Sequence, residues 1–181
     1  MRVIAGTHRS RIIKGVERET TRETKDRVKE AIFNTIGPYF TDEIVLDLFA
    51  GSGSLGIEAI SRGAMKCTFV DSDKTAIDVI TENVLSLKIQ SNSLIVYNSY
   101  VPFLRSQSSP FDIIFLDPPY KLNVIDEIIQ DIATQKLLKQ DGIIVALYDK
   151  NSVIKSLNNG IVEYKQKTSG VTKVSYLKWG I

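Results

Sequence analysis

The residues best suited to chemistry form one tetrapeptide, Asp117-Pro118-Pro119-Tyr120, which follows an apolar run of the chain. The Asp117 carboxylate and the Pro118 carbonyl are two acceptors that can orient an exocyclic NH2 group with its lone pair toward an electrophile. Two consecutive prolines stiffen the loop, so these acceptors are in place before a substrate arrives. Tyr120 offers an aromatic face on which a flipped-out base can stack. The alternative is a rigid turn with an Asp cap, and the tetrapeptide alone does not exclude it.

A second stretch with chemical content spans residues 44–56 and has the sequence IVLDLFAGSGSLG. Its apolar start, its glycines and the helical pattern that follows predict a strand, a tight turn and a helix N-terminus, an arrangement that binds nucleotide-like ligands. The glycine spacing is also the dinucleotide fingerprint, with Asp71 placed 20 residues beyond Gly51. Asp47, however, would face a pyrophosphate as an uncompensated charge, whereas a ligand with an ammonium group would find a partner there. The sequence therefore favours the second kind of ligand over a dinucleotide or a purely structural turn.

The two stretches resemble motifs of one enzyme class. Asp47-x-Phe49-x-Gly51-x-Gly53 resembles motif I of class I S-adenosylmethionine-dependent methyltransferases, and the tetrapeptide at 117–120 resembles motif IV of the members that methylate amino groups. The resemblance implies S-adenosylmethionine as cofactor and no metal. The predicted catalytic residues are Asp117, Pro118, Pro119 and Tyr120. The predicted cofactor-binding residues in and after the glycine-rich stretch are Asp47, Phe49, Gly51, Gly53, Asp71, Ser72, Asn98 and Ser99.

These cofactor assignments differ in their basis. Asp71 is expected to accept hydrogen bonds from a ribose diol, as a carboxylate at the end of the second strand can. The alternative role for Asp71 is that of a helix N-cap, for which Asp73 competes. Asn98 and Ser99 are assigned to the adenine ring by their position alone.

The elements that must position these residues follow from the hydrophobic pattern. Predicted strands cover 43–48, 67–71, 94–98, 112–117 and 142–148, and predicted helices cover 54–62, 74–87, about 100–107 and 123–137. An earlier helix is expected within 20–37, and the tail, 161–168 and 171–179, predicts a β-hairpin. Together they predict a Rossmann-like α/β fold: a doubly wound, seven-stranded sheet with an antiparallel C-terminal hairpin. Ligands on such sheets bind beyond the carboxyl ends of the strands.

Composition limits the class of protein. At 181 residues and 43% hydrophobic, the chain is expected to form one domain over 1–181. Its net charge of +2 is uneven, because residues 1–18 hold five basic residues and one acid. That segment is predicted to be a basic arm or hairpin that contacts a polyanion, and to hold the basic excess of the chain. The lone Cys67 is expected to be a buried packing residue. No membrane-spanning or signal segment is apparent, so a cytoplasmic protein is expected, by default a monomer.

Nearly the whole chain resembles the bacterial RsmD family, on the segments 1–6 (MRVIAG), 21–34 (TRETKDRVKEAIFN), 45–56 and 116–120 and on the C-terminal hairpin. Members of that family methylate N2 of one guanine in 16S ribosomal RNA. The resemblance implies the small ribosomal subunit, or its assembly intermediate, as partner. It also implies that Thr24 and Arg27 help hold the methionine end of the cofactor. The RNA-binding residues that it suggests are Arg2, His8, Arg9, Arg11, Lys14 and Arg22. The family commonly has Pro where Glu23 stands and an uncharged residue at Lys25. The shape of this loop therefore does not follow from the resemblance, whereas the chemistry does.

Three other functions are compatible with parts of this sequence. A DNA adenine-N6 or other nucleic-acid amino-methyltransferase would use the same tetrapeptide, but the chain shows no inserted target-recognition domain. A protein glutamine methyltransferase would be expected to carry Asn at position 117. A non-catalytic RNA-binding assembly factor with this fold is the alternative from a different class, and the intact Asp47, Asp71 and Asp117 argue against it.

Overall fold

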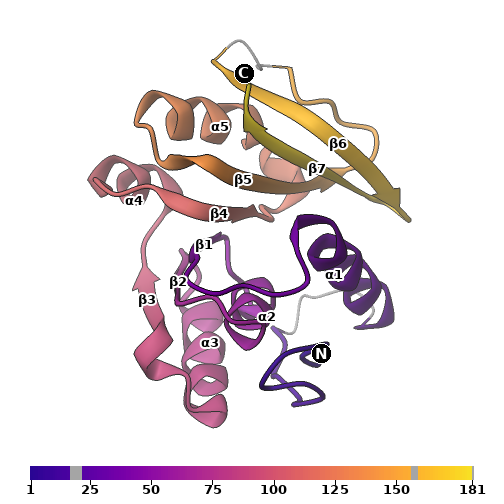
Figure 1. Ribbon diagram of the computed structural model, residues 1–181, viewed down its shortest axis with the longest axis vertical. Helices are drawn as coiled ribbons and strands as arrows, with labels where there is room; N and C mark the ends of the chain where they lie inside the picture. The colour runs from indigo at the N-terminus through magenta and orange to yellow at the C-terminus, as the bar shows by residue number, and fades with distance from the viewer. Residues whose placement is uncertain (17–21, 156–158, 181) are drawn as a thin grey trace.

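The chain folds around one mixed β-sheet. The structure, a computed structural model, describes residues 1–16, 22–155 and 159–180, with only the backbone of 22–25 (Figure 1). The strands are β1 (Ile44–Leu48), β2 (Lys66–Asp71), β3 (Ser93–Tyr97), β4 (Phe111–Leu116), β5 (Leu138–Asp149), β6 (Ile161–Ser169) and β7 (Thr172–Trp179). Their order in the sheet is β3-β2-β1-β4-β5-β7-β6, with β7 antiparallel to both of its neighbours and the other pairs parallel. The predicted doubly wound sheet with an antiparallel C-terminal hairpin is confirmed.

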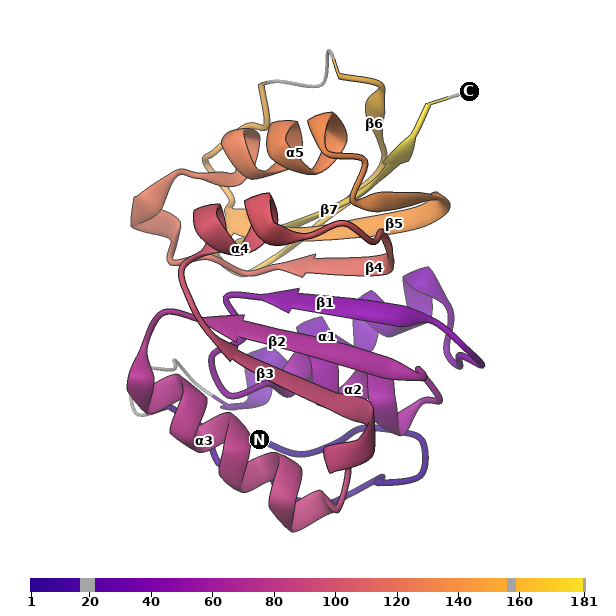
Figure 2. The same ribbon diagram turned by 90° about the vertical axis from the view of Figure 1, so that its left-hand side faces the viewer.

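Helices cover both faces of the sheet (Figure 2). One face packs against α1 (Arg22–Ile36), α2 (Ser54–Ser61) and α3 (Lys74–Leu87), and the other against α4 (Tyr100–Ser106) and α5 (Ile125–Thr134). Side chains alternate between the two cores along each strand, as in β1, where Val45 joins the first core and Leu46 the second. Among the described helices, none combines the length and the apolar character that crossing a membrane requires.

Two elements differ from the sequence prediction for local reasons. Strand β5 begins at Leu138 rather than 142, because a register shift lets it pair with β4 twice, as Phe111 with Leu138 and then as Ile113 with Ile143. Helix α5 begins at Ile125 rather than 123, because Asn123 has a left-handed backbone with φ of 49°. The polar run 139–142 (KQDG) interrupts the hydrophobic pattern of β5, which is why the pattern placed the start of this strand too late.

Residues 1–16 form an extended, hairpin-like arm. Arg2 and Ile12 pair as an antiparallel bridge, and the side chains of Val3 and Ile13 enter the core. The arm is fixed to α2 because the carboxylate of Glu58 accepts hydrogen bonds from two successive backbone N–H groups of the arm, at 2.8 and 3.0 Å. The arm is therefore part of the folded structure and not a loose tail.

Candidate active site

The turn after β1 is held by two carboxylates at the ends of neighbouring strands. Asp47 accepts a hydrogen bond from the N–H of Gly56 at 2.9 Å, and Asp71 accepts one from the N–H of Gly51 at the same distance. Gly51 and Gly53 have φ of 56° and 77°, in the left-handed region that favours glycine. These contacts fix the backbone of the turn at the N-terminus of α2, where the sequence placed a cofactor.

The position of Asp71 distinguishes between its two predicted roles. Asp73 caps α3, since its side chain accepts from the second N–H of that helix, so Asp71 is not the cap. The half-buried Asp71 carboxylate accepts two backbone N–H groups, those of Gly51 and Asp73. A carboxylate offers about four lone-pair sites, which leaves capacity for the two hydroxyls of a ribose. The residues present therefore fit the predicted cofactor.

Asp47 is only 2% exposed, and its carboxylate contacts the glycine turn through the N–H of Gly56. A direct contact between this carboxylate and an ammonium group of the cofactor stays a prediction. Of the predicted adenine residues, Asn98 accepts the backbone N–H of Ser99 through its side-chain oxygen, and Ser99 and Ser72 are exposed. Their roles also stay predictions.

The structure adds one aromatic residue that the sequence analysis missed. The ring of Phe49, at the start of the glycine turn, lies 5.4 Å from the ring of Tyr100, the first residue of α4. Both rings are half-buried at the carboxyl edge of the sheet. The available signal was the place of Tyr100 directly after Asn98 and Ser99, at the end of a predicted strand.

The tetrapeptide at 117–120 leaves the end of β4 at the same edge of the sheet. Asp117 is exposed, Pro118 is buried, and the Tyr120 hydroxyl forms a 2.7 Å hydrogen bond with the Thr172 hydroxyl at the start of β7. Burial raises the pKa of Tyr120, and the carboxylates of Asp117 and Asp149 raise it further against the effect of that hydrogen bond. Tyr120 is therefore a neutral, anchored side chain with two carboxylates near its hydroxyl.

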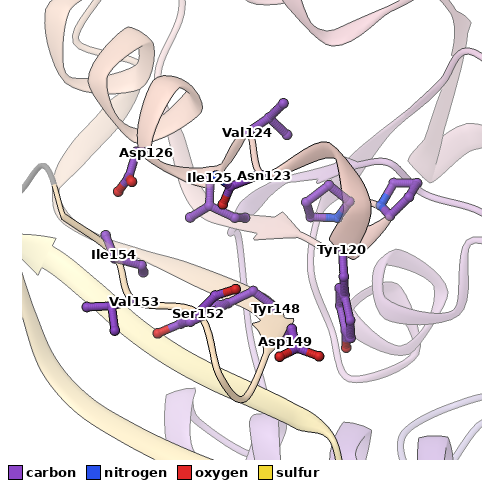
Figure 3. Close-up of a pocket in the computed structure, with 12 residues that line it drawn as sticks. Tyr120, Asn123, Val124, Ile125, Asp126, Tyr148, Asp149, Ser152, Val153 and Ile154 are labelled. Carbon is purple, nitrogen blue, oxygen red and sulfur yellow. The ribbon is translucent and has the colours of Figure 1, made fainter.

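A pocket opens beside the tetrapeptide, between the ends of β4 and β5 (Figure 3). In the view of Figure 3, Tyr120 extends from its loop alongside Asp149, while Ile154, Val153 and Asp126 lie on the far side. The lining residues are Pro118, Pro119, Tyr120, Asn123, Val124, Ile125, Asp126, Tyr148, Asp149, Ser152, Val153 and Ile154. This pocket adjoins the predicted catalytic residues, three of which line it.

The predicted RNA-binding residues lie in different places. At the apex of the arm, the N–H of His8 donates to Ser61 and the guanidinium of Arg11 donates to the carbonyl of Ser86, so both residues lie at the C-terminal ends of α2 and α3. Those helix ends lie at the edge of the sheet opposite to the tetrapeptide.

Some of the other predicted RNA- and cofactor-binding residues lie closer to the glycine turn, and the side chains of the rest lie outside the described part of the chain. Arg2 pairs with Asp26 at 3.8 Å, and Lys14 pairs with Glu82 at 2.7 Å. Arg27 is exposed on α1, whereas the side chains of Arg22 and Thr24 lie outside the described part of the chain. The RNA-binding and cofactor roles of these residues stay predictions.

Cys67, by contrast, was expected in the core and is found there. It is fully buried on β2, and burial raises the pKa of its thiol well above the ordinary value. This confirms the packing role.

Strand order, glycine turn and tetrapeptide together define a class I S-adenosylmethionine-dependent methyltransferase. A family model described as "Conserved hypothetical protein 95" matches residues 1–178, and the chain belongs to this family, the RsmD family. Two relatives carry the name "Ribosomal RNA small subunit methyltransferase D". The one from Haemophilus influenzae is 40% identical over 97% of this chain and 91% of its own length. The one from Escherichia coli K12 is 33% identical over 80% of this chain and 72% of its own length.

The solved structures agree. "Putative methyltransferase yhhF from Escherichia coli" superposes with a TM-score of 0.88 at 28% identity, over 99% of this chain and 97% of that one. The predicted family is therefore confirmed, together with its fold and its cofactor class.

Proposed function

We propose that this chain transfers the methyl group of S-adenosylmethionine to the exocyclic N2 amine of a guanine in 16S ribosomal RNA of the small subunit. The observation that carries the proposal is the Asp117–Tyr120 loop, anchored to β7 and open to a pocket, in a chain whose relatives are named as methyltransferases of small-subunit ribosomal RNA. The bound cofactor supplies an electrophilic methyl group. Every other task falls to residues of this chain.

The loop can prepare the amine for attack. The Asp117 carboxylate and the Pro118 carbonyl accept from its two N–H groups, which turns the nitrogen lone pair toward the methyl group. No strong base is needed beforehand, because the proton leaves to Asp117 or to water as the nitrogen attacks. Tyr120, fixed through its hydroxyl, presents a ring face for the base.

The pocket supports guanine over adenine. Asp149 lies beside Tyr120, and one oxygen of its carboxylate accepts the backbone N–H of Asn151 at 2.8 Å. The second oxygen is an acceptor that suits the N1–H of guanine. Adenine has no hydrogen on N1 and would present a lone pair to this carboxylate. An Asp149→Asn variant is therefore expected to lose transfer to guanine by roughly 10-fold or more, the effect of losing one charged hydrogen bond.

The reaction is tested by transfer from tritiated S-adenosylmethionine to small subunits from cells that lack this gene, with naked 16S RNA and genomic DNA alongside. Label recovered as N2-methylguanosine supports the proposal. Label recovered only in DNA would assign the chain to the adenine-N6 class. Cofactor binding without any labelled product would leave the methyltransferase class standing and the substrate wrong.

The division of roles is tested by two variants. Asp117→Ala is expected to reduce turnover by about 100-fold or more, the usual contribution of a group that handles the reacting proton, while cofactor affinity is retained. Asp71→Ala is expected to weaken cofactor binding by about 10- to 150-fold, since it removes acceptors for charged hydrogen bonds. If Asp117→Ala weakens cofactor binding as much as Asp71→Ala, the assignment of Asp117 to the amine is wrong.

A further inference from the structure

A second basic segment lies at the end of the chain. Residues 150–180 contain six lysines and a single acid, a net charge of +5, whereas residues 19–149 carry −7. The prediction that the basic excess lies in the first 18 residues is therefore incomplete. The second segment comprises the loop after β5 and the β6–β7 hairpin.

The topology brings the turn of this hairpin to the reactive edge of the sheet. Because β7 runs antiparallel to β5, its first residue, Thr172, pairs with the last residue of β5, Asp149. The N–H of Lys150 then donates to the carbonyl of Val171 at 2.9 Å, which joins the loop after β5 to the hairpin turn. The Tyr120–Thr172 hydrogen bond connects the same turn to the catalytic loop.

The lysines at this turn are available to a ligand. Lys150 and Lys167 are exposed, and neither forms an ion pair within the described part of the chain. The Lys167 ammonium donates to the Thr35 hydroxyl of α1 at 3.3 Å, beside which the hairpin ends in Figure 1. Val171, whose carbonyl accepts the N–H of Lys150, is 64% exposed.

The arm provides a weaker case for contact near the target base. Arg2 and Lys14 are already paired with carboxylates, and His8 and Arg11 lie at the opposite edge of the sheet. Charged edge strands also protect sheets against unwanted pairing, which accounts for lysines along β6. It does not account for Lys150, which lies beyond the end of β5 and not on an edge strand.

We propose that the hairpin-tip surface, formed by Lys150, Lys167 and Val171, faces the RNA beside the pocket, where its two lysines bind the phosphate backbone and steady the strand from which the target base is turned out. The proposal rests on the proposed function for the identity of the polyanion. Phosphate contacts of this kind fix position and register and carry no sequence choice, which complements a pocket that recognises the base.

The test is equilibrium binding of naked 16S ribosomal RNA at several salt concentrations. For Lys150→Gln/Lys167→Gln, loss of two phosphate contacts predicts a roughly 10- to 50-fold weaker affinity at about 0.1 M salt, and a log–log salt slope smaller by about 1.4. The matched control is Lys66→Gln/Lys178→Gln, which removes two exposed lysines from the opposite edge of the sheet. It is expected to stay within about twofold of wild type, because it lies away from the pocket. Thermal unfolding of both variants verifies that they fold.

An unchanged affinity and slope in the hairpin-tip variant would overturn the proposal, and so would an equal loss in the control, which would indicate unspecific charge. The methyl-transfer assay separates the two proposals. If wild type labels small subunits while the hairpin-tip variant binds normally, the proposed function stands and the hairpin-tip surface is wrong. If wild type labels no RNA while the variant has lost affinity, the surface stands and the assigned reaction is wrong.

Discussion

Replacement of Glu58 by glutamine is expected to destabilise the fold severely, because this carboxylate compensates two buried cations. Glu58 is fully buried on α2. It accepts from the Arg62 guanidinium at 2.8 Å and lies 3.5 Å from the Lys29 ammonium. Lys29 and Arg62 are 3% and 5% exposed, so water cannot replace the lost partner. The same carboxylate accepts the two N–H groups that fix the arm.

The magnitude follows from this burial. Glutamine keeps the size but removes the charge, and its NH2 group would replace an oxygen at which one N–H of the arm and one of the two cations already point. Breaking a buried ion pair from one side costs about 3–5 kcal/mol of unfolding free energy. At about 2–4 °C per kcal/mol for a chain of this size, the melting temperature is expected to fall by roughly 6–20 °C.

The measurement is urea and thermal unfolding of Glu58→Gln beside Glu82→Gln. Glu82 pairs with Lys14 at 2.7 Å, but both side chains are 58% exposed, so its loss is expected to cost less than about 1 kcal/mol. The Glu58–Arg62 and Glu82–Lys14 pairs have nearly equal N···O distances, so the comparison measures the effect of burial. A Glu58→Gln loss no larger than that of Glu82→Gln would refute the reasoning.

The pH dependence gives a second check on the same variant. Desolvation lowers the pKa of Lys29 below the ordinary 10.5, and Glu58 opposes this effect. The folded state therefore releases this proton at lower pH than the unfolded chain, and removing Glu58 widens the gap. As the pH rises toward 10.5, the buried amine becomes neutral and the difference between variant and wild type is expected to shrink.

Three smaller predictions concern neighbouring positions. Gly56→Ala would place a Cβ 2.4 Å from the ring of Phe69 and 2.5 Å from the sulfur of Cys67, so a loss of about 1–3 kcal/mol is expected in urea unfolding; no loss would mean that α2 can move outward. Asp73→Ala removes the N-cap of α3 and should cost about 1 kcal/mol by the same measurement, with wild-type stability contradicting the cap. The raised pKa of Tyr120 contributes stability that is lost as the pH rises above 10, because the unfolded chain releases the proton first. In Tyr120→Phe, the urea midpoint should therefore fall less between about pH 9 and pH 11 than in wild type. An equal fall in both proteins would contradict this prediction.

Local sequence was sufficient for the glycine turn and its surroundings. The turn needs left-handed backbone at Gly51 and Gly53, which few other residues adopt, so residue type alone located it. The competition between Asp71 and Asp73 was visible in the sequence but could not be decided there, because either carboxylate could cap α3. The structure decides it, because Asp73 accepts the N–H of Thr75 and so caps α3, while Asp71 contacts Gly51, 20 residues away.

The anchoring of the catalytic loop could not be predicted in the same way. Tyr120 and Thr172 are 52 residues apart, and their contact exists only because β7 lies next to β5. The sequence predicted a hairpin but gave no position for it in the sheet. The position of the arm could not be predicted for a related reason, since nothing in its residues indicates that His8 and Arg11 meet the C-terminal ends of two helices.

The position of the hairpin accounts for three features of the site at once. An antiparallel neighbour of β5 must begin where β5 ends, so the β6–β7 turn is brought to the edge at which β4 delivers Asp117. Thr172 at that turn bonds the hydroxyl of Tyr120, Val171 accepts the N–H of the exposed Lys150, and β6 carries the exposed Lys167 two residues before its end. A parallel strand in the same place would bring its carboxyl end to this edge and direct the turn elsewhere. The antiparallel order therefore couples the position of the hairpin to the geometry of the catalytic loop, and a disturbance of the hairpin register is expected to reach the chemistry through Thr172.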